Sequence, residues 1–196
     1  MLAESAGADA IGLVFYEPSP RSVSIATAVE IRKAVSPMVT VVALVVDASS
    51  ELVRQIIRAV QPDIVQYHGD ETAMFCDAIG HPYWKAVRVR SAQDVISASE
   101  EFQAARSLLL DAWVDGVPGG TGQEIDRSAM PTSLHRPWIL AGGLRPENVS
   151  EALSHYRPSA VDVSSGVESS PGVKDPAKIH AFVNAVVSFD KVNPHE

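Results

Sequence analysis

The sequence has one cysteine, few aromatic residues and no long apolar run. Cys76 is the only cysteine among 196 residues, so no disulfide can form within the chain, which fits a reducing compartment. The longest apolar runs, such as Val39–Val46, are far shorter than the stretch of about 20 residues that crosses a bilayer. The chain also does not open with a charged segment, an apolar segment and a small-residue cleavage site, so we expect no signal peptide and a cytoplasmic protein.

Positive charge is scarce as well. Lysine and arginine number 16 against 24 acidic residues, the net charge is -8, and no basic cluster offsets it. This balance argues against a nucleic-acid partner. Hydrophobic residues make up 46% of the chain and charged residues 20%, as in ordinary globular proteins. The length suits one domain, which we place at residues 1–196.

Short apolar runs rich in β-branched residues alternate with amphipathic segments. Near-continuous apolar runs are typical of strands buried on both faces of a parallel sheet, and their alternation with helices predicts βαβ units. Helices are expected at Ile25–Val35, at Ser49–Val60 after capping serines, and after the Asp175-Pro176 start signal. The predicted strands are Ala10–Phe15, Thr40–Val46, Ile64–His68, Trp84–Val89, Ser107–Ala112, Trp138–Ala141 and Ala160–Val163.

The ends of these strands favour a closed (β/α)8 barrel over an open doubly wound sheet. An open sheet collects its special residues at one switch point, whereas a barrel active site draws on the carboxyl ends of many strands. Here nearly every predicted strand is followed by polar or glycine-rich residues. They are Tyr16–Arg21, Asp47, His68–Asp70, Asp111, Gly142-Gly143 and Ser164–Gly166.

The number of strands is one short of a barrel. Seven are predicted, and this fold has eight. Residues 1–6 have the character of a helix end, with Gly7 as its stop. A helix in that place normally follows a strand. We therefore expect a (β/α)8 barrel that lacks its first strand, so that seven parallel strands remain.

Two glycine- and serine-rich segments follow the last two strands, at Gly142-Gly143 and at Ser165-Gly166. Small residues let backbone N–H groups approach an anion, and a helix expected from about Pro146 would add its positive end. Phosphate commonly binds between these two loops of a barrel. Either segment alone is more simply an ordinary turn. Together they predict a phosphate site.

Asp111 ends the apolar run Leu108–Leu110, and a carboxyl group at the mouth of a barrel is placed to act as a general acid. Asp115 is a less constrained rival on the following loop. Gly119–Gly122 forms a glycine-rich stretch that suits a lid or a third wall of the phosphate site, although simple flexibility is as good an explanation.

Three further side chains have competing explanations. Arg21, stiffened by neighbouring prolines, could bind a carboxylate with both arms of its guanidinium, or it could be solvated. His68 is either a hydrogen-bonding group of the pocket or a strand cap. Cys76 falls within the helical segment Glu71–Ile79, where a buried core residue is a better interpretation than a nucleophile.

Taken together, these motifs resemble the phosphoribosylanthranilate isomerase family over nearly the whole chain and in the right order. The segments that carry the resemblance are Gly7–Gly12 with Phe15-Tyr16 and Ser19–Arg21, Val65–Glu71, Leu110-Asp111, Gly119–Gly122, Leu140–Leu144 and Val161–Asp175. The family is a (β/α)8 barrel of tryptophan biosynthesis. It converts N-(5-phosphoribosyl)anthranilate to 1-(2-carboxyphenylamino)-1-deoxyribulose 5-phosphate, an Amadori rearrangement that uses no metal or other cofactor.

The resemblance implies roles for residues of this chain. Asp111 would be the general acid that protonates the furanose ring oxygen. Arg21 would bind the anthranilate carboxylate, with His68 and Gly122 also contacting the substrate. Gly142, Gly143, Ser165 and Gly166 would hold the phosphate.

The chain departs from the family at the catalytic base. In the family this is a cysteine within a Lys-x-Cys-Gly segment on the first strand. Cys76 corresponds to an outer helix and cannot replace it. We therefore expect the chain as written to be inactive for want of the base, through either truncation or loss of that strand.

Two alternatives stay open at this point. One is another phosphosugar barrel enzyme, such as indole-glycerol-phosphate synthase. The other is a non-catalytic, phosphate-binding remnant of the isomerase barrel. In each case the expected partner is a small phosphorylated molecule and neither nucleic acid nor membrane, and the chain is expected to be a monomer or a homodimer.

Overall fold

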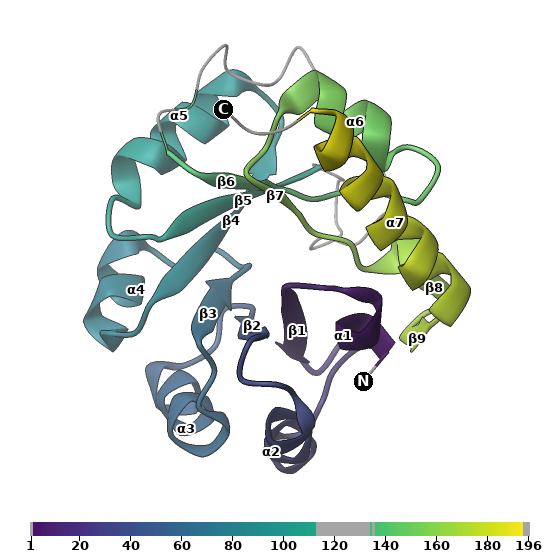
Figure 1. Cartoon of the computed structure of the whole chain (residues 1–196). Helices are drawn as coiled ribbons and strands as arrows, with labels where there is room; N and C mark the ends of the chain where they lie inside the picture. Colours follow the sequence, from purple (N-terminus) through teal and green to yellow (C-terminus); the bar gives the residue numbers. More distant parts are fainter. Residues whose placement is uncertain (1, 113–133, 135, 194–196) are drawn as a thin grey trace.

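Seven parallel strands curve around a common centre, and helices cover their outer side (Figure 1). The structure is a computed structural model, and it describes residues 2–112, 134 and 136–193. The strands are β1 (Ala10–Phe15), β2 (Thr40–Val45), β3 (Ile64–Tyr67), β4 (Tyr83–Val89), β5 (Ser107–Ala112), β6 (Trp138–Leu140) and β7 (Ala160–Val161), followed by a hairpin of β8 (Glu168–Ser170) and β9 (Val173–Lys174). The helices are α1 (Leu2–Ala6), α2 (Ile25–Ala34), α3 (Ser50–Val60), α4 (Ala73–Ile79), α5 (Ala92–Glu101), α6 (Val149–Tyr156) and α7 (Pro176–Val192), with a 3-10 turn, η2, at Ser165–Val167.

All seven predicted strands are present, in chain order and in parallel register. The bounds of β1 and β5 match the expected ones, and those of the other five differ by one or two residues. The largest difference is at β7, which ends at Val161 rather than Val163. Even so, the backbone N–H of Asp162 still donates to the carbonyl of Leu140 at 2.8 Å, so contact with β6 continues past the end of β7.

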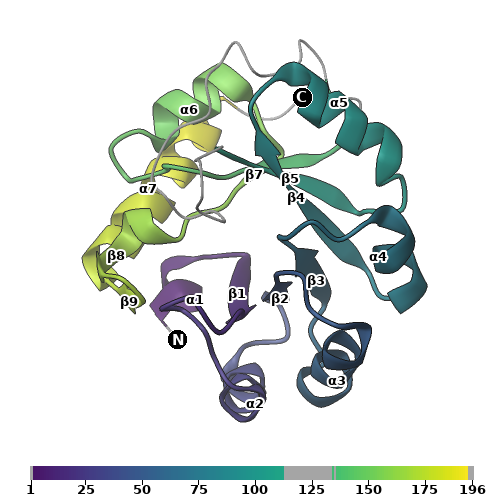
Figure 2. The same cartoon turned by 180° about the vertical axis from the view of Figure 1, so that it is seen from behind.

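The ring of strands is open between β1 and β7. Among the described residues, β1 pairs along its length with β2 alone, and β7 with β6 alone. The outer layer is continuous at the same place, because α1 packs against α7 (Figures 1 and 2). The seven-strand barrel predicted from the sequence is therefore confirmed, with its helical layer joined across the gap in the strands.

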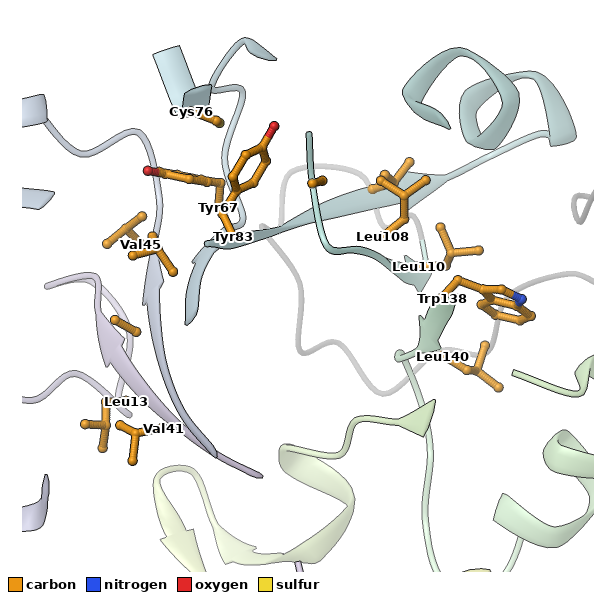
Figure 3. Close-up of a cluster of buried hydrophobic side chains, with 14 of the residues drawn as sticks. Leu13, Val41, Val45, Tyr67, Cys76, Tyr83, Leu108, Leu110, Trp138 and Leu140 are labelled. Carbon is orange, nitrogen blue, oxygen red and sulfur yellow. The ribbon is translucent and has the colours of Figure 1, made fainter. Parts of the chain in front are cut away.

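Side chains alternate between the two faces of the curved sheet. The larger apolar cluster lies between the strands and the helices and includes Leu108 and Leu110 of β5 (Figure 3). Leu109, between them in sequence, belongs to a second, smaller cluster with Ala86 and Ile139. Because successive side chains of a strand point to opposite faces, this smaller cluster fills the inside of the barrel.

Polar side chains cap several helices as the sequence predicted. Ser49 accepts a hydrogen bond from the N–H of Leu52 at the start of α3, and Asp175 accepts from the N–H groups of Ala177 and Lys178 at the start of α7. These bonds satisfy backbone donors that the first helical turn leaves without a partner. At the other end of α1, Gly7 adopts a φ of 99°, which fits its predicted role as a helix stop.

Cys76 is fully buried in α4, which confirms its assignment to the core. Burial raises the pKa of its thiol to about 12, so the group stays protonated at neutral pH and is a poor nucleophile. Within the described residues, no helix has the length and apolar character needed to cross a membrane.

Candidate active site

Four polar side chains point into the barrel near the carboxyl ends of four strands: His68, Arg88, Asp111 and Asp162. Their sequence neighbours, such as Tyr67, Val87 and Leu110, belong to the outer apolar cluster, so strand alternation directs these four to the inner face. Arg88 and Asp111 are register partners on β4 and β5. The barrel mouth is thus lined by groups that can carry or exchange protons.

His68 and Asp111 form the centre of this group. His68 Nε2 lies 3.4 Å from Asp111 Oδ2, and both side chains are almost inaccessible to solvent. Gln66 Nε2 lies 2.9 Å from His68 Nδ1. An amide nitrogen can only donate, so Nδ1 accepts this bond, and the neutral ring then carries its hydrogen on Nε2, facing the carboxyl group. Within the described residues Nε2 makes no hydrogen bond, so Asp111 is its near neighbour and not yet its acceptor.

Asp162 brings a second carboxyl group to the same interior. Dehydration by the surrounding protein, and then the negative charge of Asp111, raise the pKa of Asp162, while His68 and Lys174 oppose the rise. Because the side chain of Asp162 is exposed to solvent, dehydration acts on it only weakly, and the like charge of Asp111 is the stronger cause. The negative charge of Asp111 thus disfavours ionisation of Asp162.

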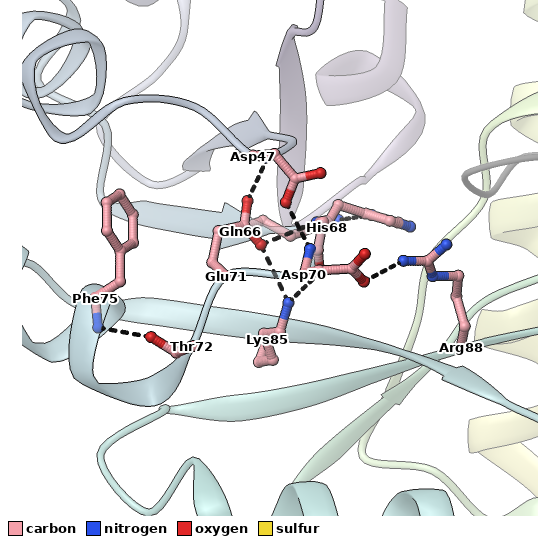
Figure 4. A network of polar contacts seen from close by, with 10 residues as sticks. Asp47, Gln66, His68, Asp70, Glu71, Thr72, Phe75, Lys85 and Arg88 are labelled. Carbon is pink, nitrogen blue, oxygen red and sulfur yellow. Dashed lines mark hydrogen bonds and ion pairs between the residues drawn. The ribbon is translucent and has the colours of Figure 1, made fainter.

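The loop that carries His68 is held by the buried carboxylate of Glu71 (Figure 4). Its Oε1 accepts from the backbone N–H of Asp47 at 2.8 Å, and its Oε2 accepts from that of Gly69 at 3.0 Å. Asp47 in turn accepts from the N–H of Asp70 at 2.7 Å. A Cβ at position 69 would lie 2.3 Å from Asp47 Oδ1, which explains why glycine follows His68.

Lys85 neutralises Glu71 from β4. Its Nζ lies 3.1 Å from Glu71 Oε2 and donates to the carbonyl of Gly69 at 2.6 Å. Both side chains are at most 6% exposed. Removing one member of a buried ion pair typically costs about 3–5 kcal/mol, because the other charge is left buried without a partner. The loop after β3 is therefore tied firmly to β2 and β4.

The two predicted phosphate loops lie against each other. Gly142 and Gly143 have φ values of 81° and 64°, a conformation that suits glycine. A Cβ on Gly166 would lie 1.9 Å from the carbonyl oxygen of Leu144, so the second loop touches the first through its glycine. The structure therefore brings together the four residues predicted to hold phosphate.

The helix after the first of these loops begins later than expected, at Val149 rather than near Pro146. Asn148 is the reason. Its Oδ1 accepts from the N–H of Arg145 at 2.7 Å, and its Nδ2 donates to the carbonyl of Gly143 at 3.0 Å. These bonds close residues 143–148 into a turn before the helix starts.

Arg21 is paired, not solvated. Its Nε and Nη2 donate to the two carboxylate oxygens of Glu168, at 2.7 and 2.8 Å. Lys174 Nζ lies 3.2 Å from Glu168 Oε1. Burial opposes ionisation of Glu168, but the hydrogen bonds from Arg21 and Lys174 outweigh it and lower the pKa of this carboxyl group.

Some predicted residues lie outside the described part of the chain, namely Gly122 with the rest of Gly119–Gly122, and Asp115. Within the described residues, no group of three or more His, Cys, Asp or Glu side chains could hold a metal ion.

A family model for N-(5'phosphoribosyl)anthranilate (PRA) isomerase matches residues 2–185. The chain belongs to this family. It is 51% identical over 186 residues to the N-(5'-phosphoribosyl)anthranilate isomerase of Pseudomonas fluorescens strain Pf0-1, covering 95% of this chain and 91% of that one. The Cellvibrio japonicus enzyme of the same name is 48% identical over 185 residues, covering 94% of this chain and 86% of that one.

Solved structures of the family agree with the fold. The phosphoribosyl anthranilate isomerase of Thermotoga maritima superposes with a TM-score of 0.85 at 34% identity, over 95% of this chain and 92% of that one. The Thermus thermophilus enzyme gives 0.84 at 32% identity with the same coverage of both chains. Membership of the family thus extends along nearly all of the chain, as the sequence motifs indicated.

The sequence analysis did not identify Asp162, Glu71 or Glu168 as parts of the site. Asp162 has a signal that could have revealed it, because it is the one charged residue between Val161 and Val163 at a strand end. Glu71 and Glu168 have no such signal. Their importance depends on partners 14 and 147 residues away.

We expect Gly166→Ala to weaken phosphate binding by at least about tenfold, since one hydrogen bond to a charged group is worth about 1.5–3 kcal/mol. The added methyl group must push the second loop away from Leu144, which separates the two sets of N–H donors. Titration with inorganic phosphate measures the effect. Gly12→Ala is the matched control, because a Cβ at position 12 meets nothing within 4 Å. Equal affinity in both variants would contradict the phosphate site.

Proposed function

We propose which described residues carry out each part of the phosphoribosylanthranilate isomerase reaction, the activity of this family in tryptophan biosynthesis. Asp111 is the general acid, the two glycine loops hold the phosphate of the substrate, and Arg21 binds the carboxylate of its anthranilate ring. The observation that carries the proposal is the buried Asp111 carboxyl group beside His68 Nε2, at the end of the barrel where Gly143 and Gly166 also lie.

Ring opening needs a proton at the furanose oxygen as the bond to the anomeric carbon breaks. Asp111 is in a position to deliver it, because its side chain is buried among strand ends and faces the barrel interior. The anilino nitrogen between the anthranilate ring and the sugar supplies the electron pair, so that a C=N double bond, the Schiff base, forms as the bond to the ring oxygen breaks. His68 Nε2 lies 3.4 Å from the carboxyl group, and a small shift of the ring would let it donate to the Asp111 carboxylate once the proton has left.

The second step removes a proton from C2 of the sugar and gives an enolamine, which tautomerises to the product. In the family this base is the cysteine of a Lys-x-Cys-Gly strand. We place the base in the gap between β1 and β7, because a strand there would extend the sheet on both sides and end at the mouth. Residues 1–196 alone would then bind the substrate without turning it over. Among the described carboxylates, Asp162 is the first candidate to replace the cysteine as the base.

Substrate binding follows from the same arrangement. A solved family member, 33% identical to this chain, is described as a complex with reduced 1-(o-carboxyphenylamino)-1-deoxyribulose 5-phosphate. That compound has a phosphate at one end and a carboxylate at the other, which matches the glycine loops and Arg21. Gly122 would contact it from the loop after β5. We further propose that residues 1–196 form one domain, that no metal takes part, and that the protein acts in the cytoplasm as a monomer or homodimer.

If the base belongs in the gap between β1 and β7, residues 1–196 should fail to restore growth of a tryptophan auxotroph that lacks this isomerase. The same chain with a Lys-x-Cys-Gly strand from a family member fused ahead of residue 1 should restore it. Among the described residues, the outer edges of β1 and β7 have no strand partner, apart from the single bridge of Val14 to Ser22, so we expect the unfused chain to aggregate more readily. Equal growth with both chains would show that the base is already present, with Asp162 as the first candidate.

Asp111→Asn, made in the fused chain, should keep substrate binding and lose turnover by about 10²–10⁴-fold, because an amide preserves the shape but cannot deliver the proton. Steady-state kinetics and a binding titration measure the two effects separately. Asp9→Asn makes the same change at the opposite, amino end of β1 and should leave both unchanged. A parent chain that forms indole-glycerol phosphate from 1-(2-carboxyphenylamino)-1-deoxyribulose 5-phosphate would favour the synthase, and one that binds phosphate without any turnover would favour the non-catalytic alternative.

A further inference from the structure

The guanidinium of Arg21 is only half used within the protein. Its Nε and one side of Nη2 are held by Glu168. A guanidinium presents five N–H donors, and those on Nη1 and on the outer side of Nη2 form a second edge that fits a carboxylate. Among the described residues, no acceptor is recorded for that second edge. The Arg21 side chain keeps 23% of its surface exposed, so a ligand can reach part of it.

Glu168 itself is fixed from several sides. Its side chain is 4% exposed and contacts Lys174 Nζ as well as Arg21. The N–H of Gly172 donates to Oε2 at 3.3 Å, and Lys178 Nζ donates to the backbone carbonyl of Glu168 at 2.7 Å. A carboxylate with this many fixed partners can hold Arg21 in one orientation.

The two segments that carry this pair also touch each other. Gly172, in the turn between β8 and β9, has a φ of 83°, and a Cβ there would lie 2.6 Å from the carbonyl oxygen of Pro20. The loop before Arg21 is closed by bonds from the N–H of Ser22 to the Ser19 carbonyl and from the N–H of Arg21 to Ser19 Oγ. The loop after β1 and the hairpin after β7 thus form one unit.

We infer that Glu168 is a positioning residue for the carboxylate of the substrate: it grips one edge of Arg21 and leaves the other edge oriented for the anthranilate group. The inference rests on the proposed function. Arg21 and Lys174 carry two positive charges against the one negative charge of Glu168, so the cluster keeps a net positive charge for an incoming carboxylate. An arginine that is held beforehand also loses less side-chain entropy when the ligand binds.

The test is a set of binding titrations in which the carboxylate is absent from the protein in one variant and from the ligand in one probe. The probes are reduced 1-(o-carboxyphenylamino)-1-deoxyribulose 5-phosphate and its counterpart without the ring carboxylate. Glu168→Gln should weaken binding of the first probe by at least about tenfold, the scale of one hydrogen bond to a charged group. It should leave the second probe within about twofold. Glu17→Gln, an exposed change of the same charge in the loop before Arg21, is the control and should affect neither probe.

The outcomes separate the inference from the proposed function. If Glu168→Gln weakens the binding of both probes equally, Glu168 acts on the fold alone. If Glu168→Gln binds the carboxylated probe more tightly, Glu168 competes with the ligand for Arg21. Either result overturns the positioning role. If the unaltered chain binds both probes equally well, Arg21 does not meet the ring carboxylate, and the proposed function fails at that residue. Thermal unfolding of each variant, with Glu168→Asp as a second substitution, identifies any loss of folding.

Discussion

One buried carboxylate, that of Glu71, joins three strands at the mouth of the barrel. It receives backbone N–H groups from the ends of β2 and β3 and the ammonium of Lys85 from β4. Phe102 covers the same ammonium, with 5.5 Å between Nζ and the ring centroid. Charges at this depth are stable only when they are paired and hydrogen-bonded, so the geometry of these partners is narrowly defined.

The proposed arrangement of His68 and Asp111 depends on these contacts of Glu71. His68 follows β3 directly and precedes Gly69, whose N–H and carbonyl both belong to the network around Glu71. The position of the His68 imidazole beside Asp111 is therefore set by residues that need not touch the substrate. Glu168 plays a corresponding part on the other side of the mouth, where it holds Arg21 and Lys174. In both places an acidic residue with little exposure orients groups of the opposite charge.

The fold could be predicted from the sequence because its signals are local. Apolar runs such as Leu108–Leu110, capping residues such as Ser49 and Asp175, and the glycine stop at Gly7 act within a few residues of themselves. The positions of Asp111 and the two glycine loops also followed from one rule, that the carboxyl ends of parallel strands meet. What could not be predicted is pairing over long separations. Arg21 meets Glu168 across 147 residues, and no pattern near either residue specifies the other.

Seven strands bring three groups to the mouth of the barrel, which is open between β1 and β7 among the described residues. In the proposed function the described residues provide the acid, the phosphate site and the carboxylate site, and these three must bind one molecule at once. A crystal structure of this chain with reduced 1-(o-carboxyphenylamino)-1-deoxyribulose 5-phosphate tests this most directly. We predict that the phosphate lies between Gly143 and Gly166 and the sugar beside Asp111. The ring carboxylate is expected on the edge of Arg21 formed by Nη1 and the outer side of Nη2. A phosphate bound elsewhere, or an Asp111 carboxyl group out of reach of the sugar, would contradict this prediction.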